Sequence, residues 1–280
     1  MSKRIIKIPN IKDEIDLALK HGYHRFILTV GEKNLGKSTL NLLLLHEIFN
    51  DGFRSPTEAW VEAFKHLCFT PRQFYEKYIE VKDRIDKELM RVGLPSSILD
   101  MDIETEWGSI IEMVIGLKGD VQAFTKYRES YRIPALLVDD MGAHMNRQDV
   151  SIYYNPFFQQ LFADLTLIRP YIACLLATCP KVSDLPRSVL KHVTDVIHVT
   201  GQGRAKYRKI RDFIKFRGAN VEGFLKLYDG DPIHWDPLPK DIYAKYEILR
   251  HLPSRKVSQK AKLALIEADM KLGYTPPTLH

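Results

Sequence analysis

The segment from Gly31 to Ser38 has residue types and spacing that suit the binding of phosphate groups. It reads Gly-Glu-Lys-Asn-Leu-Gly-Lys-Ser and fits the phosphate-loop pattern GxxxxGK[ST] without a mismatch. Glycines allow backbone N–H groups to converge on phosphates, and a helix expected to begin near Gly36 adds its positive N-terminal dipole. Lys37 supplies a cation for the β- and γ-phosphates, while Ser38 and Thr39 offer hydroxyls to Mg²⁺ and to a phosphate. The predicted nucleotide-binding residues are Gly31, Glu32, Lys33, Asn34, Leu35, Gly36, Lys37, Ser38 and Thr39.

Two adjacent carboxylates, Asp139 and Asp140, directly follow the apolar run 135–138. At the end of a buried strand, Asp139 is suited to coordinate Mg²⁺, usually through water. Ser38 and Asp139 therefore form the predicted metal site. Asp140 could accept the proton of the attacking water as a general base. Its alternative interpretation is the cap of a turn or helix.

Thr178 follows the next apolar run, residues 171–177. In a parallel sheet, the ends of neighbouring strands meet at the edge that holds the phosphate loop. Thr178 could therefore sense the γ-phosphate or hold the attacking water, and we group it with Lys37 and Asp140 as a catalytic candidate. A plain threonine at a strand end is the alternative.

The elements that must position these residues alternate between strands and helices. Buried strands are predicted at 26–30, 135–138, 171–177 and 193–199, and helices at 11–20, 38–49 and 156–168. Each strand is a continuous apolar run, which is typical of a parallel sheet covered on both faces. The fold class is thus α/β, a three-layer P-loop NTPase sandwich with a mainly parallel central sheet. A glycine-rich turn that binds nothing is disfavoured, because an apolar strand precedes the loop and an apolar helix follows it.

Three regions are predicted along the chain. Residues 1–24 form a lead-in helix, residues 25–200 the ATPase core, and residues 201–280 a small basic extension. Within the core, residues 53–131 are a largely helical insertion, with helices at 71–90, 106–117 and 121–131. In the extension we expect short strands at 213–216, 224–228 and 232–235, and helices at 240–250 and 258–271.

Composition excludes several classes of protein. Among the 280 residues, no apolar stretch approaches the length of a membrane span, and no cleavable leader follows the basic N-terminus. We therefore expect no membrane partner and a cytoplasmic location, in a host cell if the protein is encoded by a virus or plasmid. The 3 cysteines show no zinc-ligand spacing, which favours buried reduced thiols.

The net charge of +6 is concentrated in the C-terminal part. Residues 201–280 hold 16 Lys and Arg against 9 Asp and Glu, whereas residues 1–200 hold 25 against 26. Seven basic residues lie between positions 204 and 217, with aromatic residues among them. The basic side chains could neutralise DNA phosphates, so we predict that the 204–217 segment contacts DNA. A solvated basic face is the alternative, and aromatic residues at strand spacing are more often part of a core.

These motifs resemble the additional-strand class of P-loop ATPases, in which another strand separates the phosphate-loop strand from the Walker B strand. Two branches compete. The segment Leu-Leu-Val-Asp-Asp-Met-Gly at 136–142 resembles Walker B of DnaA- and DnaC-type AAA+ proteins, and 68–74 is weakly similar to their second strand and helix. The segment 177–186, continuing through 195–197, resembles FtsK/HerA-type translocases and packaging ATPases. Both branches include ATPases of archaeal viruses and plasmids, which the whole chain resembles.

The resemblance implies Mg²⁺-dependent ATP hydrolysis by a homo-oligomer, such as a hexameric ring, that acts on DNA. Genome translocation or packaging is the favoured role, and replication initiation or helicase loading of the AAA+ kind is the alternative. A small-molecule P-loop kinase is less favoured. A direct test between the two branches is the structure that follows the last core strand, because AAA+ proteins place a helical lid there and translocases a β-hairpin.

The sequence departs from both branches. Glu32 and Lys33 replace the proline and threonine common in AAA+ loops, and Cys179 stands where translocases usually carry glutamine. Lys191 and His192 stand near the position of an AAA+ arginine. Two candidates for an arginine that acts on a neighbouring subunit are Arg169 and Arg187.

Overall fold

A computed structural model describes residues 6–7, 11–50, 52, 54–91, 105–115, 131–144, 155–213, 225–227 and 232–252. The chain divides into two compact units, Met1–Asp236 and Pro237–His280. The first unit holds the sheet and the predicted site. In the second unit, residues 240–252 are helical, as expected. The predicted helix at 258–271 lies outside the described residues, as does nearly all of the one at 121–131.

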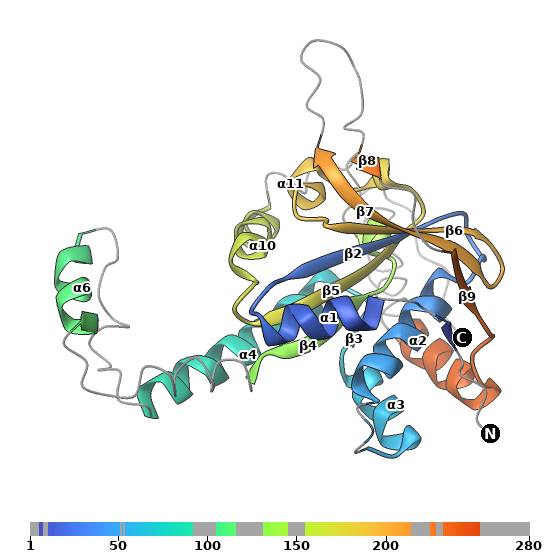
Figure 1. Ribbon diagram of the computed structural model, residues 1–280, viewed down its shortest axis with the longest axis horizontal. Coiled ribbons are helices and arrows are strands. Elements are labelled where there is room, and N and C mark those ends of the chain that lie inside the picture. Colours follow the sequence, from blue (N-terminus) through green and yellow to red (C-terminus); the bar gives the residue numbers. More distant parts are fainter. Residues whose placement is uncertain are drawn as a thin grey trace, which may run out of the picture. The chain divides into compact units, whose positions relative to one another are not determined.

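The first unit is built on one mixed sheet (Figure 1). Its parallel part comprises β2 (Arg25–Val30), β3 (Leu67–Cys68), β4 (Ile133–Val138), β5 (Ile172–Cys179) and β6 (Asp195–Gly201). Four further strands pair antiparallel: β1 (Ile6–Lys7), β7 (Arg204–Phe213), β8 (Leu225–Leu227) and β9 (Pro232–Trp235). The strand order is β1-β9-β7-β6-β2-β5-β4-β3, with β8 attached to β7. Because β5 lies between β2 and β4, the sheet has the additional strand that the sequence predicts.

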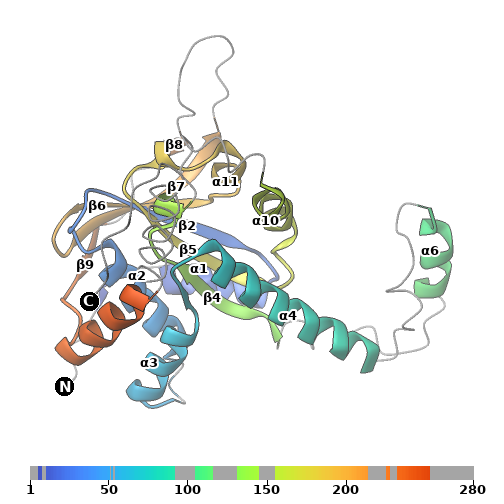
Figure 2. The same cartoon turned by 180° about the vertical axis from the view of Figure 1, so that it is seen from behind.

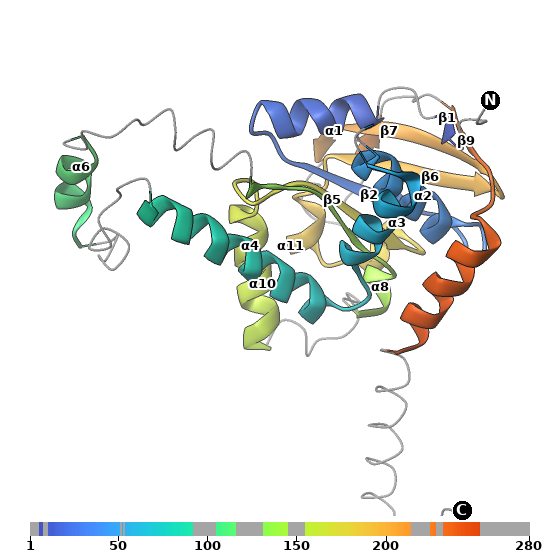
Figure 3. The ribbon, with the colours of Figure 1, turned by 90° about the horizontal axis from the view of Figure 1, so that it is seen from below.

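Helices cover both faces of the sheet, which makes the unit a three-layer α/β sandwich (Figure 3). On one face, α1 (Ile11–Lys20) contacts β4 and β5, and α2 (Lys37–Phe49) contacts β2, β4 and β5; α3 (Pro56–Lys65) packs against α2. The opposite face, seen in Figure 2, carries α4 (Pro71–Arg91) and α10 (Pro156–Leu167). The shorter elements are α6 (Trp107–Ile115), α8 (Met141–His144), the 3₁₀ turn η1 (Val182–Asp184) and α11 (Arg187–Leu190).

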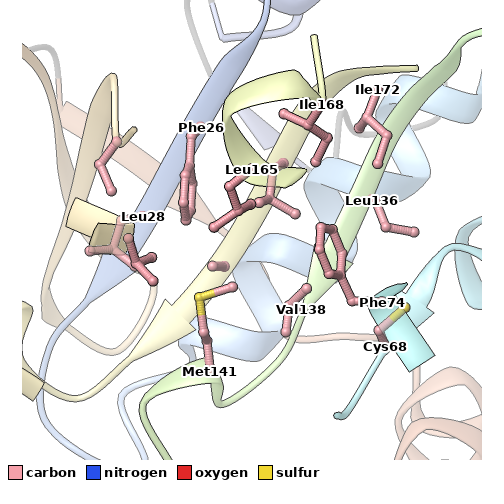
Figure 4. Packing of buried hydrophobic residues seen from close by; sticks show 14 of the residues in the cluster. Phe26, Leu28, Cys68, Phe74, Leu136, Val138, Met141, Leu165, Ile168 and Ile172 are labelled. Atoms are coloured by element: carbon pink, nitrogen blue, oxygen red, sulfur yellow. The ribbon is translucent and has the colours of Figure 1, made fainter. Parts of the chain in front are cut away.

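Alternate residues of each parallel strand point into the two apolar layers. Phe26 and Leu28 of β2 pack with Leu136 and Val138 of β4 on the α4 side (Figure 4). Helix α4 contributes Phe74 and three more residues at helical spacing, namely Tyr78, Val81 and Ile85. Burial of a Leu or Phe side chain stabilises a protein by roughly 1.5–3 kcal/mol relative to exposure. Burial on both faces explains why these strands read as continuous apolar runs.

The sheet extends beyond the expected end of the core. We expected the core to end near residue 200, but β7 pairs with β6 from Arg204 to Lys209, and the division of the chain falls after Asp236. Of the strand predicted at 213–216, only Phe213, the last residue of β7 (Arg204–Phe213), lies within the described residues. The alternation of exposed and buried residues from Arg204 to Tyr207 explains why this segment forms a strand, since a period of two is the pattern of a half-buried strand.

A buried carboxylate fixes the junction of β6, β7 and β2. Asp195 has no exposed surface and accepts hydrogen bonds from Tyr207 Oη at 2.8 Å and Thr194 Oγ1 at 2.6 Å. Arg25, which also pairs with Glu14, lies 3.6 Å from the Asp195 carboxylate. Burial together with the neighbouring Asp195 charge raises the pKa of Tyr207. These contacts explain how a charged residue is accommodated at the start of an otherwise apolar strand.

Among the described helices, none has the length and apolar character needed to cross a membrane. The three cysteines, Cys68, Cys174 and Cys179, are buried free thiols, as the sequence indicates. Burial raises the pKa of the Cys68 thiol to about 12.

Candidate nucleotide-phosphate site

The predicted phosphate loop forms the turn between β2 and α2. Its backbone takes positive φ angles at Gly31 (150°), Asn34 (64°) and Gly36 (88°), and Gly36 occupies the N-cap position of α2. A Cβ atom on Gly31 would lie 2.8 Å from the carbonyl oxygen of Val199. Glycine at position 31 therefore allows β6 to approach the loop closely. The loop carries the N–H groups of the first turn of α2, which is the arrangement that binds anions.

Lys37 folds back over this loop. Its Nζ donates hydrogen bonds to the carbonyl oxygens of Gly31 at 2.8 Å and Glu32 at 2.7 Å. Both acceptors belong to the first turn of the loop, so the ammonium group lies where the loop wraps. The side chain thus places a positive charge beside the loop that is predicted to bind the phosphates.

Asp139 joins the phosphate loop to the ends of the neighbouring strands. It is 1% exposed, and its Oδ1 accepts hydrogen bonds from Ser38 Oγ at 2.7 Å and Thr178 Oγ1 at 2.8 Å. Its backbone N–H donates to the carbonyl oxygen of Cys68 at 2.8 Å. The structure therefore brings together Ser38 and Asp139, the two predicted metal ligands, on the same side of the sheet as the loop.

This pair of oxygen donors suits Mg²⁺, which prefers carboxylate, hydroxyl, phosphate and water oxygens and is rarely enclosed by protein ligands alone. The residues that the structure describes contain no cluster of three or more His, Cys, Asp or Glu side chains that could hold a metal ion. An ion at this site would complete its shell with phosphate oxygens and water.

Thr178 connects the two aspartates. Its hydroxyl donates to Asp139 Oδ1 and accepts a hydrogen bond of 2.6 Å from the backbone N–H of Asp140. The side chain is 2% exposed, and Thr178 pairs with Thr29 of the phosphate-loop strand. On this geometry Thr178 holds both aspartates in place relative to the loop.

Asp140 adopts a left-handed backbone conformation, with φ at 53°. Such a conformation is unfavourable for a residue with a side chain, and the hydrogen bond from Asp140 N–H to Thr178 helps to hold it. Asp140 directly precedes α8, yet no hydrogen bond between its carboxylate and that helix is found in the described part of the chain. Its half-buried carboxylate is therefore available to a ligand beside Asp139.

Cys179, at the position where translocases usually carry glutamine, is buried. Its thiol donates to the carbonyl oxygen of Lys181 at 3.1 Å, and burial raises the pKa of the thiol. A Cβ atom on Gly142 would lie 3.1 Å from Cys179 Cβ, so these two residues pack closely. Cys179, the last residue of β5, packs against Gly142 of the segment that follows the aspartates and offers no charged group to the site.

A cavity of about 540 Å³ borders the start of the phosphate loop. Its polar lining includes Lys33 from the loop, Lys181 from the segment after β5 and the exposed His198 from β6. Sequence reasoning did not assign Lys181 or His198 to the site. The alternation of β6 could have indicated that His198 points to the surface. Its place beside the phosphate loop follows from the pairing of β6 with the loop strand, in which Val30 lies opposite His198.

The two arginine candidates lie apart from the loop. Arg169 donates to the carbonyl oxygen of Gly22 at 2.7 Å, and its guanidinium carbon lies 5.9 Å from the centre of the Tyr23 ring. Both contacts are near the beginning of β2, at the edge of the sheet opposite the phosphate loop. Arg187 is exposed at the start of α11. In the described part of the chain, neither arginine hydrogen-bonds the loop.

The predicted DNA-contacting segment is only partly described. Residues 204–213 form β7, on which Arg204 and Lys206 are exposed, and residues 214–217 lie outside the described residues. Lys206 lies opposite His198, and Arg204 lies opposite the exposed His234 of β9. Tyr207 is buried against Asp195, so this aromatic residue belongs to the core.

Neither a protein-family model nor a curated protein matches this chain. Among solved structures, the chain is similar to two structures of one protein, the genome packaging NTPase B204 from Sulfolobus turreted icosahedral virus 2. The complex with AMPPCP is 17% identical, with 62% of this chain and 74% of that chain covered and a TM-score of 0.27. The complex with ATP-gammaS is 14% identical, with 77% and 98% covered and a TM-score of 0.33. At these identities and TM-scores, what the site does is inferred from its own geometry.

Proposed function

We propose that the protein binds ATP with Mg²⁺ and hydrolyses it. The observation that carries this proposal is the contact of 2.7 Å between Ser38 Oγ and Asp139 Oδ1 beside the loop over which Lys37 folds. A glycine-rich anion cradle, a cation and a pair of hard oxygen ligands together match the needs of a metal-bound triphosphate.

In this proposal each residue has a separate role. Backbone N–H groups of the loop and the Lys37 ammonium bind the phosphates, and Thr39 adds a hydrogen bond. Ser38 and Asp139 hold Mg²⁺, which would neutralise charge on the β- and γ-phosphates. Water attacks the γ-phosphorus, the bond to the bridging oxygen breaks, and the Asp140 carboxylate accepts the proton that the water loses. Thr178 keeps both aspartates in position.

ATP turnover tests this proposal. We expect Mg²⁺-dependent release of phosphate by the wild-type protein and loss of both ATP binding and turnover in Lys37→Ala. Lys20→Ala is a matched control, because Lys20 is an exposed residue at the end of α1. Unchanged ATP affinity in Lys37→Ala would reject the assignment of the phosphate site.

We further propose that the ATPase acts on DNA as a homo-oligomeric translocation or packaging motor. Support comes from β7, which follows the last parallel strand, β6, and pairs with it antiparallel at the point where an AAA+ protein has a helical lid. Four exposed cationic or titratable side chains also gather on β6, β7 and β9, namely His198, Arg204, Lys206 and His234. The alternative role, AAA+ replication initiation or helicase loading, is not supported by β7, because an AAA+ protein has a helical lid at this point.

A charge reversal tests the DNA proposal separately from ATP binding. Arg204→Glu with Lys206→Glu should weaken DNA binding and flatten its dependence on salt, since fewer counterions are released. Turnover without DNA should stay unchanged, while stimulation of turnover by DNA should fall. Mass measurement in the presence of ATP tests for a ring. The proposed motor function would be rejected if DNA did not change the ATP turnover of the wild-type protein and if this protein bound no DNA at low salt.

A further inference from the structure

Trp235 of β9 lies against the second glycine of the phosphate loop, although 199 positions separate the two residues in the sequence. A Cβ atom built on Gly36 would lie 3.5 Å from Trp235 Nε1 and 3.6 Å from Trp235 Cζ2, and it would lie 3.9 Å from Thr39 Cβ. The indole edge that carries the N–H group therefore faces the N-terminal end of α2. Trp235 thus belongs to the surroundings of the loop, which the sequence pattern does not reveal.

The backbone around Trp235 fixes this position. Its N–H donates to the carbonyl oxygen of Gly203 at 3.2 Å, and a Cβ atom on Gly203 would lie 2.9 Å from the Trp235 carbonyl oxygen. Gly203 has a φ of 68° and belongs to the turn between β6 and β7. Val199 of β6, in turn, closely approaches Gly31. The loop is therefore bordered by β6 at its first glycine and by β9 at its second.

The strand order gives the phosphate loop two distinct sides. Strands β5 and β4, with Thr178, Asp139 and Asp140, lie on one side of β2, whereas β6, β7 and β9 lie on the other. Mg²⁺ bridges the β- and γ-phosphates in P-loop sites, so the γ-phosphate must lie toward Asp139. Because a triphosphate is a linear chain, its nucleoside end must leave the loop on the opposite side, where Trp235 lies.

The indole N–H of Trp235 is placed to donate a hydrogen bond to a ligand. Trp235 is 7% exposed, and buried tryptophans usually place their N–H against an acceptor. None of the residues that the structure describes accepts a hydrogen bond from Trp235 Nε1, and this atom is not among the fully buried atoms that lack a partner, so water or a ligand can reach it. An oxygen of the ribose would supply that acceptor, and the ring would give the nucleoside an apolar wall.

We propose that Trp235 contacts the nucleoside end of the bound nucleotide, with its indole N–H donating to a ribose oxygen. This inference rests on the proposed ATP-binding function and adds a residue to that site. If the inference is correct, Trp235 contributes to the binding of ATP but not to that of inorganic tripolyphosphate, which has the phosphates but no nucleoside.

Binding of these two ligands to wild-type protein and two variants tests the inference. Trp235→Phe keeps a ring but removes the N–H, and it should weaken ATP binding about fivefold, the loss expected for one hydrogen bond. Trp235→Leu also removes the ring and should weaken ATP binding about tenfold or more. Both variants should bind tripolyphosphate within about twofold of wild type, because the loop itself is unchanged.

Fluorescence gives a second readout that does not depend on a change in affinity. The chain has 3 tryptophans, so Trp60→Phe with Trp107→Phe leaves Trp235 as the sole indole. ATP should change its emission and protect it from acrylamide, with the midpoint that calorimetry gives. The matched control keeps only Trp60, which stacks on His46 with ring centres 4.1 Å apart, and its emission should not respond.

The outcomes separate this inference from the proposed function. Wild-type ATP affinity in both variants, with a Trp235 emission insensitive to ATP, would overturn the inference and leave ATP binding intact. Equal losses for ATP and tripolyphosphate would also overturn it, because they would show that Trp235 only supports the loop. Wild-type protein that binds neither ligand would overturn the proposed function and this inference with it.

Discussion

Ser38 Oγ lies 2.7 Å from Asp139 Oδ1, and this hydrogen bond joins residues 101 positions apart. It crosses β5, the strand between the phosphate-loop strand and the Walker B strand. The contact shows that the glycine loop and the strand-end carboxylates face one another. Two motifs that could each arise for structural reasons thereby become a single site.

Asp140→Asn should separate binding from chemistry. The amide keeps the size of the side chain but cannot accept the proton of water, so turnover should fall about 100- to 10,000-fold while ATP affinity stays near that of wild type. Single-turnover hydrolysis and calorimetric titration measure the two quantities. Asp184→Asn, in the turn after β5, is a control for carboxylate loss. Undiminished turnover in Asp140→Asn would mean that another group is the base.

Thr178→Val should affect both stability and turnover. It removes the hydroxyl that binds Asp139 and Asp140, and the buried Asp139 oxygen and Asp140 N–H lose a partner. We expect the free energy of unfolding to fall by about 1–3 kcal/mol, measured by denaturant titration. The turnover number should also fall, because Asp140 is no longer held. Thr178→Ser should restore both, and a valine variant with wild-type turnover would contradict the positioning role.

Tyr207→Phe tests the buried junction of β6 and β7. Without its hydroxyl, Asp195 keeps Thr194 and Arg25 but loses a hydrogen bond to a charged group, which typically contributes about 1.5–3 kcal/mol. The free energy of unfolding should fall by that order. Tyr243→Phe is the control, since Tyr243 is 49% exposed. Equal stability of the two variants would show that the Tyr207 contact adds nothing.

His24 should make stability depend on pH in mild acid. Burial, above all, lowers its pKa from 6.5 to about 4, although its Nδ1 lies 2.8 Å from the carbonyl oxygen of Ile172. The unfolded chain therefore binds the proton more tightly than the folded protein. The stability that neutral His24 confers is complete above pH 6.5 and is lost as the pH falls toward 4, a change of about 3 kcal/mol.

Denaturant titrations of wild type and His24→Gln between pH 7 and pH 4 measure this effect. The variant should lose stability less steeply than wild type over that range. His21→Gln is the control, because His21 is exposed. Parallel pH profiles for wild type and His24→Gln would contradict the assignment.

The sequence predicted the parallel sheet well for a physical reason. Strands buried on both faces must be apolar throughout, so β2, β4 and β5 stand out as continuous runs. The chemistry of phosphate binding requires glycines and a lysine at fixed spacing, and that pattern located the loop. The position of Asp139 followed because strand ends in a parallel sheet share one edge.

Other features depend on contacts that local patterns do not encode. Strand β7 carries charges on one face and Ala205 and Tyr207 on the other, so its charge concealed its alternation. Trp235 reaches Gly36 only because β9 pairs with β7, a contact between distant segments. The insertion at 53–131 remains a prediction where it lies outside the described residues.

The most direct test of the central claim is the effect of Mg²⁺ on ATP affinity in wild type, Ser38→Ala and Asp139→Asn, measured by calorimetry. In wild type, Mg²⁺ should strengthen ATP binding, because Ser38 and Asp139 together hold the ion against the phosphates. In either variant most of that strengthening should disappear, while binding of ATP without Mg²⁺ should change little in Ser38→Ala. The same Mg²⁺ effect in all three proteins, or no ATP binding by wild type, would contradict the account.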